Sequence, residues 1–208
     1  MNGFDYERWL ASMDDLSARF VSGFIEKFGY PSGENGVSRA AGPLPDGVDE
    51  LPAPLAEFYR NVSEVSLPDL QHGYFVSPAR AVVDGRDGRL PVRIEGPDGT
   101  DVVSFGSDGG GTHFALGLLA GVPVYALPPS AVDRRGVYDN HDSRARVVAA
   151  TLPEFLTKLH DLLASATSRY DPDARRTPRR CASDCHDPVR VEAGEAVPGI
   201  LEWGWCGS

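Results

Sequence analysis

The sequence predicts an α+β protein in which helices pack on a mainly antiparallel sheet of about five or six strands. Residues 101–127 contain three short apolar runs separated by Gly-rich turns, a pattern typical of consecutive antiparallel strands. Amphipathic stretches precede and follow these runs, at residues 6–28 and 151–163, with large apolar side chains three and four positions apart. The strands therefore lie between an N-terminal and a C-terminal helix.

The N-terminal stretch, residues 6–28, predicts one long helix with a single buried face, formed by Trp9, Met13, Leu16, Phe20, Phe24 and Phe28. Residues 29–52 shift to Gly, Pro, Ser and acidic residues without periodicity, which indicates a loop or linker. A second helix is expected from Pro54, because proline suits a first helical turn. Its apolar face comprises Leu55, Phe58, Tyr59 and Val62.

The middle of the chain predicts the strands. Residues 73–83 are expected to be extended, and residues 92–94 form a short alternating run. A β-hairpin is predicted from 102–105 and 113–116, joined by the Gly-rich residues 106–111. The run at 122–127 is a further strand, with Pro123 tolerated at an edge or near a strand's start.

The last predicted helix opens with Thr151 and Glu154, which fit a capping box. In that motif the hydroxyl and the carboxylate each accept a hydrogen bond from an otherwise unpaired backbone N–H. The buried stripe that follows consists of Phe155, Leu156, Leu159, Leu162 and Leu163.

Composition and charge limit the classes of function. The chain has 208 residues, 41% hydrophobic and 24% charged, which suits one globular domain with an appendage. No window offers the roughly 20 apolar residues of a membrane span, and the start lacks a basic, then apolar, leader, so a cytoplasmic protein is expected. The net charge of -10 argues against nucleic-acid binding and favours a basic protein partner, although such a charge is also a common solubility feature.

The Gly-rich segment 106–111 invites comparison with a phosphate-binding loop. A Walker loop needs Gly-Lys-Ser or Gly-Lys-Thr before a helix, whereas Gly111 precedes Thr112, His113 and a strand pattern. A hairpin turn accounts for the glycines. Asp108 could ligate a cation, but a turn-capping role is favoured because aspartate readily accepts from its own backbone two residues on.

An active site would have to use His72, His113, His141 or His160 with Asp108, Asp139 or Asp142 as orienting carboxylates. The sequence has no nucleophile elbow and no His-Glu-x-x-His helix. We therefore expect no enzymatic activity and no cofactor.

The C-terminal cysteines raise the question of zinc. Cys181, Cys185, His186 and Cys206 could in principle supply a Cys₃His set. Their spacing departs from the usual Cys-x-x-Cys of structural sites, and the odd cysteine count argues against a disulfide framework. Reduced cysteines without a metal are expected.

The order of several short motifs resembles the SUKH superfamily, which groups yeast cell-wall-synthesis regulators with bacterial immunity proteins. The motifs are Leu51-Pro52 before a helix, Gly73-Tyr74, Phe105-Gly106 with Asp108-Gly109, the break at Ala120-Gly121-Val122, Pro123-Val124-Tyr125, and a terminal helix opening at 152–156. The resemblance implies helices packed on a mainly antiparallel sheet and protein binding without catalysis. Bacterial members neutralise a polymorphic toxin made by the same cell or its kin.

The predicted SUKH-like domain covers residues 1–167, and 168–208 form a C-terminal extension beyond the usual family domain. The extension is Arg-rich at first (Arg175, Arg176, Arg179, Arg180) and then contains the cysteines and two tryptophans. The arginines fit either an interaction arm or a solvated basic linker.

The resulting hypothesis is a non-catalytic immunity protein that blocks the active surface of a toxin with a basic cleft. Candidate contacts are the loop and turn aspartates Asp69, Asp84, Asp87, Asp98, Asp108, Asp139 and Asp142. One alternative is a housekeeping interaction scaffold of the same fold without a toxin partner. Another is a hydrolase that uses His113 or His141.

Overall fold

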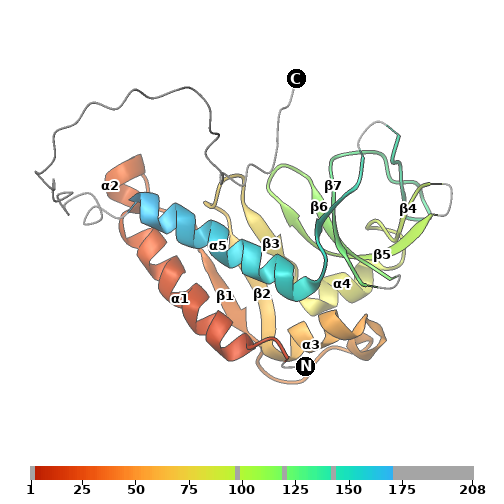
Figure 1. Ribbon diagram of the computed structural model, residues 1–208, viewed down its shortest axis with the longest axis horizontal. Helices are drawn as coiled ribbons and strands as arrows, with labels where there is room; N and C mark the ends of the chain where they lie inside the picture. The colour runs from red at the N-terminus through yellow and green to blue at the C-terminus, as the bar shows by residue number, and fades with distance from the viewer. Residues whose placement is uncertain (1–2, 97–98, 119–120, 142–143, 171–208) are drawn as a thin grey trace, which may run out of the picture. The chain divides into compact units, whose positions relative to one another are not determined.

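A nine-stranded sheet, with β4 and β8 off its main path, runs through the residues that the structure describes (Figure 1). The structure is a computed structural model and describes residues 3–96, 99–118, 121–141 and 144–170. The strand order is β1-β2-β3-β5-β6-β7-β9, and β4 pairs with β5 and β8. The strands are β1 (Gly36–Arg39), β2 (Val62–Leu67), β3 (Tyr74–Val76), β4 (Arg93–Ile94), β5 (Thr100–Asp108), β6 (His113–Gly117), β7 (Val124–Leu127), β8 (Val137–Tyr138) and β9 (Arg146–Ala149).

The predicted fold class is confirmed: the protein is α+β, with helices packed on a mainly antiparallel sheet. Every strand pair is antiparallel except β4 with β8, which are parallel. Nine strands replace the expected five or six. The helices are α1 (Tyr6–Ser22), α2 (Phe24–Phe28), α3 (Ala53–Asn61), α4 (Ala79–Gly85) and α5 (Leu152–Tyr170), with a 3₁₀ turn at Val48–Glu50.

Helices α1 and α5 lie side by side on one face of the sheet (Figure 1). The indole Nε1–H of Trp9 on α1 donates to the carbonyl oxygen of Leu156 on α5 at 3.1 Å. The ring of Phe155 lies 5.5 Å from that of Phe105 and 5.1 Å from that of Phe114. These contacts place the main hydrophobic core between the two helices and the central strands.

The predicted single helix over residues 6–28 is wrong, because the chain breaks at Gly23 between α1 and α2. Glycine loses more conformational entropy in a helix than other residues do, so a helix breaks readily at a glycine. The apolar stripe nevertheless continues, since the rings of Phe20 and Phe24 lie 6.0 Å apart. At the start of α1, the side chain of Asp5 accepts from the Arg8 N–H at 3.0 Å.

Residues 29–52 are not simply a loop. They contain β1 and the 3₁₀ turn, and β1 pairs with β2, which begins at Val62. Val62 was expected to continue the second helix, but α3 ends at Asn61. This pairing joins segments distant in sequence, which local periodicity cannot reveal.

The segment 73–83 is extended only in its first half. Strand β3 ends at Val76, and Ala79–Gly85 form α4, with the preceding Pro78 at the N-cap position. The three apolar residues at 81–83 were therefore wrongly expected to be extended. One of them, Val82, is 1% exposed and packs inward from the helix.

The predicted hairpin of β5 and β6 is confirmed, and β4 also pairs with β5. The loop of the β5–β6 hairpin begins later than predicted, because Gly106 and Asp108 still belong to β5. A Cβ on Gly106 would overlap the Phe75 carbonyl oxygen, and one on Gly109 would overlap that of His72. These glycines permit the close approach of β3 and its preceding turn.

Pro123 precedes β7, which is not an edge strand because β6 and β9 flank it.

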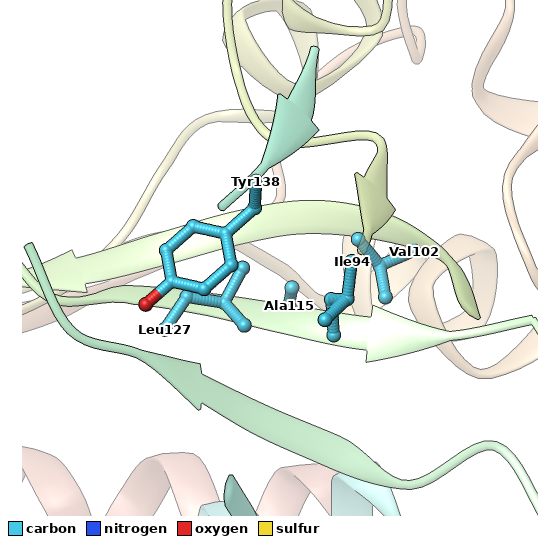
Figure 2. Close-up of a cluster of buried hydrophobic side chains, with 5 residues drawn as sticks. All are labelled: Ile94, Val102, Ala115, Leu127 and Tyr138. Atoms are coloured by element: carbon cyan, nitrogen blue, oxygen red, sulfur yellow. The ribbon is translucent and has the colours of Figure 1, made fainter. Parts of the chain in front are cut away.

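A second, smaller core lies on the sheet face opposite the helices (Figure 2). It is formed by the buried side chains of Ile94, Val102, Ala115, Leu127 and Tyr138. Side chains alternate between the two faces of a strand, so Ala115 points away from the face on which Phe114 meets α5. Strands β4 and β8 supply Ile94 and Tyr138, and they cover this part of the sheet.

The C-terminal helix matches the expected capping. Glu154 N–H donates to Thr151 Oγ1 at 3.2 Å, and the Glu154 carboxylate accepts from the Ala150 N–H at 2.8 Å. The helix runs to Tyr170, so the predicted domain boundary after residue 167 falls in its last turn. Residues 171–208, including the predicted Arg-rich and cysteine segments, lie outside the described residues. None of the described helices combines the length and hydropathy of a membrane span.

Candidate binding groove

A groove of about 650 Å³ lies where α1 meets the first three strands of the sheet. Its lining comes from one side of α1, from the segment before β1, and from β1, β2 and the end of β3. The polar lining residues are Asp14, Ser17, Glu34, Asn35, Ser38, Glu64, Ser66 and Ser77. Four segments that are separate in sequence therefore build one cavity.

The groove is acidic. Asp14, Glu34 and Glu64 line it, and no lysine, arginine or histidine is among its lining residues in the described part of the chain. Arg39 lies nearby, with Nη2 3.9 Å from Asp14 Oδ2, but its Nη1 donates to Glu7 at 2.8 Å. One arginine shared by two carboxylates leaves the groove with a net negative charge.

Small side chains on α1 account for the hollow. Ser17, Ala18 and Val21 are the uncharged residues that α1 contributes to the lining. Ser17 is 4% exposed, and its hydroxyl has no hydrogen-bond partner in the structure. A buried hydroxyl without a partner costs free energy, so Ser17 lowers the stability of this part of α1.

The predicted contact residue Asp69 shapes one end of the groove. Its Oδ2 accepts from the Gly33 N–H at 2.7 Å and from Asn35 Nδ2 at 2.6 Å. The Asp69 N–H donates back to Asn35 Oδ1 at 3.2 Å. These bonds hold the chain on both sides of Glu34. Asp69 therefore holds the backbone beside Glu34, although Asp69 is not itself a lining residue.

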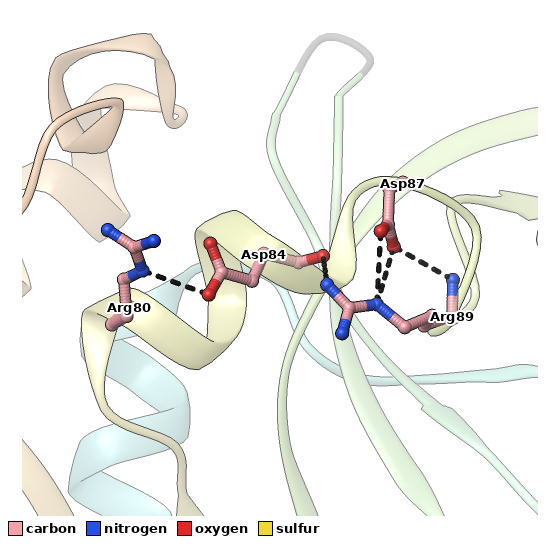
Figure 3. Close-up of polar contacts among 4 residues, drawn as sticks. All are labelled: Arg80, Asp84, Asp87 and Arg89. Carbon is pink, nitrogen blue, oxygen red and sulfur yellow. Dashed lines mark hydrogen bonds and ion pairs between the residues drawn. The ribbon is translucent and has the colours of Figure 1, made fainter.

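Two other predicted aspartates, Asp84 and Asp87, are engaged with arginines at the end of α4 (Figure 3). Arg80 Nε donates to Asp84 Oδ2 at 2.9 Å, and Arg89 Nε donates to both carboxylate oxygens of Asp87 at 2.9 and 3.0 Å. Arg89 also donates to the backbone oxygen of Asp84 at 2.8 Å. The hydrogen bond from Arg89 lowers the pKa of Asp87. This surface carries opposite charges in pairs rather than an acidic patch.

Asp108 was expected to lie in an exposed loop as a contact residue, but it does not. It ends β5, is 9% exposed, and its Oδ1 accepts from the N–H groups of Gly110 and Thr112 at 2.9 and 2.8 Å. The turn-capping interpretation is confirmed, and the carboxylate is committed to the hairpin.

The described candidate aspartates do not form one surface. Asp139 follows β8, where its Oδ1 accepts from the His141 N–H at 2.9 Å. Asp98 and Asp142 lie outside the described residues. The structure instead brings together three carboxylates that the sequence analysis missed, at residues 14, 34 and 64. No local motif marks them.

None of the histidines considered for catalysis lines this groove. His113 begins β6, where burial lowers its pKa and the carboxylate of Asp108 opposes that shift. The His141 side chain is 80% exposed. Ser12 Oγ and His160 Nε2 are hydrogen-bonded at 2.8 Å, and His160 Nδ1 lies 3.1 Å from Asp161 Oδ1. A serine, a histidine and an aspartate in this order also form the catalytic triad of hydrolases. Here the hydrogen bond between Ser12 and His160 joins α1 to α5.

Comparisons of this chain with protein-family models, with curated proteins and with solved structures found no match.

Proposed function

We propose that this chain is a non-catalytic, cytoplasmic protein-binding protein whose acidic groove takes a basic segment of a partner protein. The observation that carries the proposal is the convergence of Asp14, Glu34 and Glu64 on one groove without a lining cation. The net charge of -10 supports it, because a negative protein attracts a basic partner over long range.

The partner in this proposal is a toxin domain, as the resemblance to the SUKH superfamily implies. Toxins that act on nucleic acids need a positive cleft to hold phosphates. An acidic groove offers carboxylates in place of those phosphates, so binding would cover the cleft and block its substrate. Neutralisation then needs no chemistry from the immunity protein.

The groove suits a lysine or arginine side chain. A guanidinium or ammonium group would pair with the carboxylates that line the groove. Desolvated charge pairs of this kind depend on geometry, so they favour one partner over others.

The partner is identified by capture from the native host's lysate with the tagged full chain. Three proteins are used: the wild type, the groove variant D14N/E34Q/E64Q and the control variant E26Q/D46N/E57Q. The control removes the same number of exposed carboxylates outside the groove lining, so total charge changes equally. A partner in the groove is captured by the wild type and the control and lost by the groove variant.

A growth test then separates immunity from the alternatives. The captured protein is expressed alone and together with the chain in a heterologous bacterium. Killing by the partner and rescue by the wild type, but not by the groove variant, supports immunity. A harmless partner that still requires the groove favours the housekeeping scaffold. Rescue by the groove variant, lost in H113Q or H141Q, would favour the hydrolase.

A further inference from the structure

A carboxylate–histidine cluster lies outside the groove, where β4 and β8 end. The ligand atoms of Glu95, Asp139 and His141 all lie within 4.8 Å of one another. We propose that these three side chains form a binding site for a divalent transition-metal ion, with Zn²⁺ as the ligand that fits best. The site is independent of the proposed function.

The parallel pairing of β4 with β8 creates the cluster. Ile94 pairs with Tyr138, and the Glu95 N–H donates to the Tyr138 carbonyl at 3.0 Å. Glu95 and Asp139 therefore leave neighbouring strands at the same end. Ile94 and Tyr138 are buried in the second core, so the next residue on each strand points away from that core toward solvent.

The backbone after β8 returns the third ligand to the same place. Asp139 N–H donates to the Ala131 carbonyl at 2.9 Å, and the His141 N–H donates to Asp139 Oδ1 at 2.9 Å. The second hydrogen bond folds the chain back on itself, and His141 Nε2 lies 3.7 Å from Glu95 Oε2. Asp139 keeps its other oxygen, Oδ2, for a metal.

The ligand types favour zinc. One imidazole nitrogen with two carboxylate oxygens is a combination that Zn²⁺ accepts at about 2.0 to 2.2 Å, with a fourth position open to water. Tetrahedral binding at that distance needs ligand atoms about 3.4 Å apart, a small closure for exposed side chains. Magnesium and calcium prefer all-oxygen shells, which the histidine does not supply.

Arg93 on β4, two residues before Glu95, is already ion-paired. Arg93 shares a strand face with Glu95, and its charge would oppose a bound metal ion. Its guanidinium is ion-paired with the carboxylate of Asp101 on β5. The two carboxylates of the cluster therefore remain to balance the charge of Zn²⁺.

The test is isothermal titration of the full chain with ZnCl₂. The background variant C181S/C185S/H186Q/C206S removes the only cysteines and a neighbouring histidine, so that zinc held by the C-terminal extension does not contribute. In this background E95Q, D139N and H141Q are compared with the matched controls E57Q and H72Q. Thermal unfolding without metal shows whether each variant is folded.

We expect the background and both controls to bind one Zn²⁺ per chain. Each ligand variant should bind more than about 100-fold more weakly, a larger loss than the roughly 10- to 100-fold that removal of an outer-shell partner produces. Co²⁺ in place of Zn²⁺ should give visible absorption that disappears in H141Q. The proposal is overturned if the background binds no Zn²⁺, or if folded H141Q and E95Q keep its affinity.

Discussion

Ile94 and Tyr138 face each other as register partners in the one parallel strand pair of the described residues, and both are buried, at 5% and 1% exposure. The Tyr138 hydroxyl also donates to the carbonyl oxygen of Pro128 at 2.8 Å. These contacts tie two short strands to the main sheet through the second core. They also set the backbone from which Glu95 and Asp139 project.

Replacing Ile94 with alanine should lower the free energy of unfolding by about 3 kcal/mol, because it leaves a cavity in a closely packed cluster. Ile94→Val should cost only about 1 kcal/mol. Urea denaturation measures both changes. Zinc affinity should fall in Ile94→Ala but hold in Ile94→Val, since only the larger deletion loosens β4. Equal unfolding free energies for the two variants would contradict this account of the second core.

Replacing Ser17 with alanine should raise the free energy of unfolding by about 1 kcal/mol. The change removes a buried hydroxyl without a hydrogen-bond partner, and alanine also favours the helix interior. Ala18→Ser, at a neighbouring lining position, is the control. A less stable Ser17→Ala protein would mean that the hydroxyl is satisfied in solution.

His113 should make the protein less stable in mild acid. Burial lowers its pKa from the ordinary 6.5, so the folded state takes up its proton less readily than the unfolded state does. Its contribution to stability is therefore present above pH 6.5 and is lost as the pH falls through the folded-state pKa. Urea denaturation from pH 8 to pH 5 measures this slope.

His113→Gln, which cannot ionise, should flatten the part of the slope that His113 causes. His72→Gln, at an exposed position, is the matched control for the loss of a histidine. An identical pH dependence in wild type and His113→Gln would assign the acid sensitivity to other groups.

Local patterns predicted the elements whose signals are complete within one segment. The capping pair Thr151 and Glu154 located α5, and the Gly-rich turn located the β5–β6 hairpin. Strand β1 could not be found in this way. It is short and polar, and it becomes a strand only by pairing with β2. The same applies to β8, whose two residues are ordered by β4.

The candidate sites were less predictable than the fold, because each is assembled from separate segments. Glu34 stood in a predicted loop and Glu64 in a segment not expected to be a strand, so nothing in the sequence placed them beside Asp14. Asp139 was singled out for its loop position, but its neighbour Glu95 was not, since only the parallel pairing joins them. The aspartates in turns were easy to find in the sequence. Most of the described ones accept hydrogen bonds from backbone N–H groups or pair with arginines.

The carboxylates of the groove should provide most of the affinity for a basic partner. The decisive measurement is the affinity of the captured partner for wild type, D14N/E34Q/E64Q and E26Q/D46N/E57Q at low and high salt. Binding in the groove predicts a roughly tenfold or larger loss of affinity in the groove variant alone, because three ion pairs at about 0.5 to 1 kcal/mol each reach that factor. It also predicts that high salt weakens the wild type most. Equal losses in both variants, or an affinity independent of salt, would contradict it.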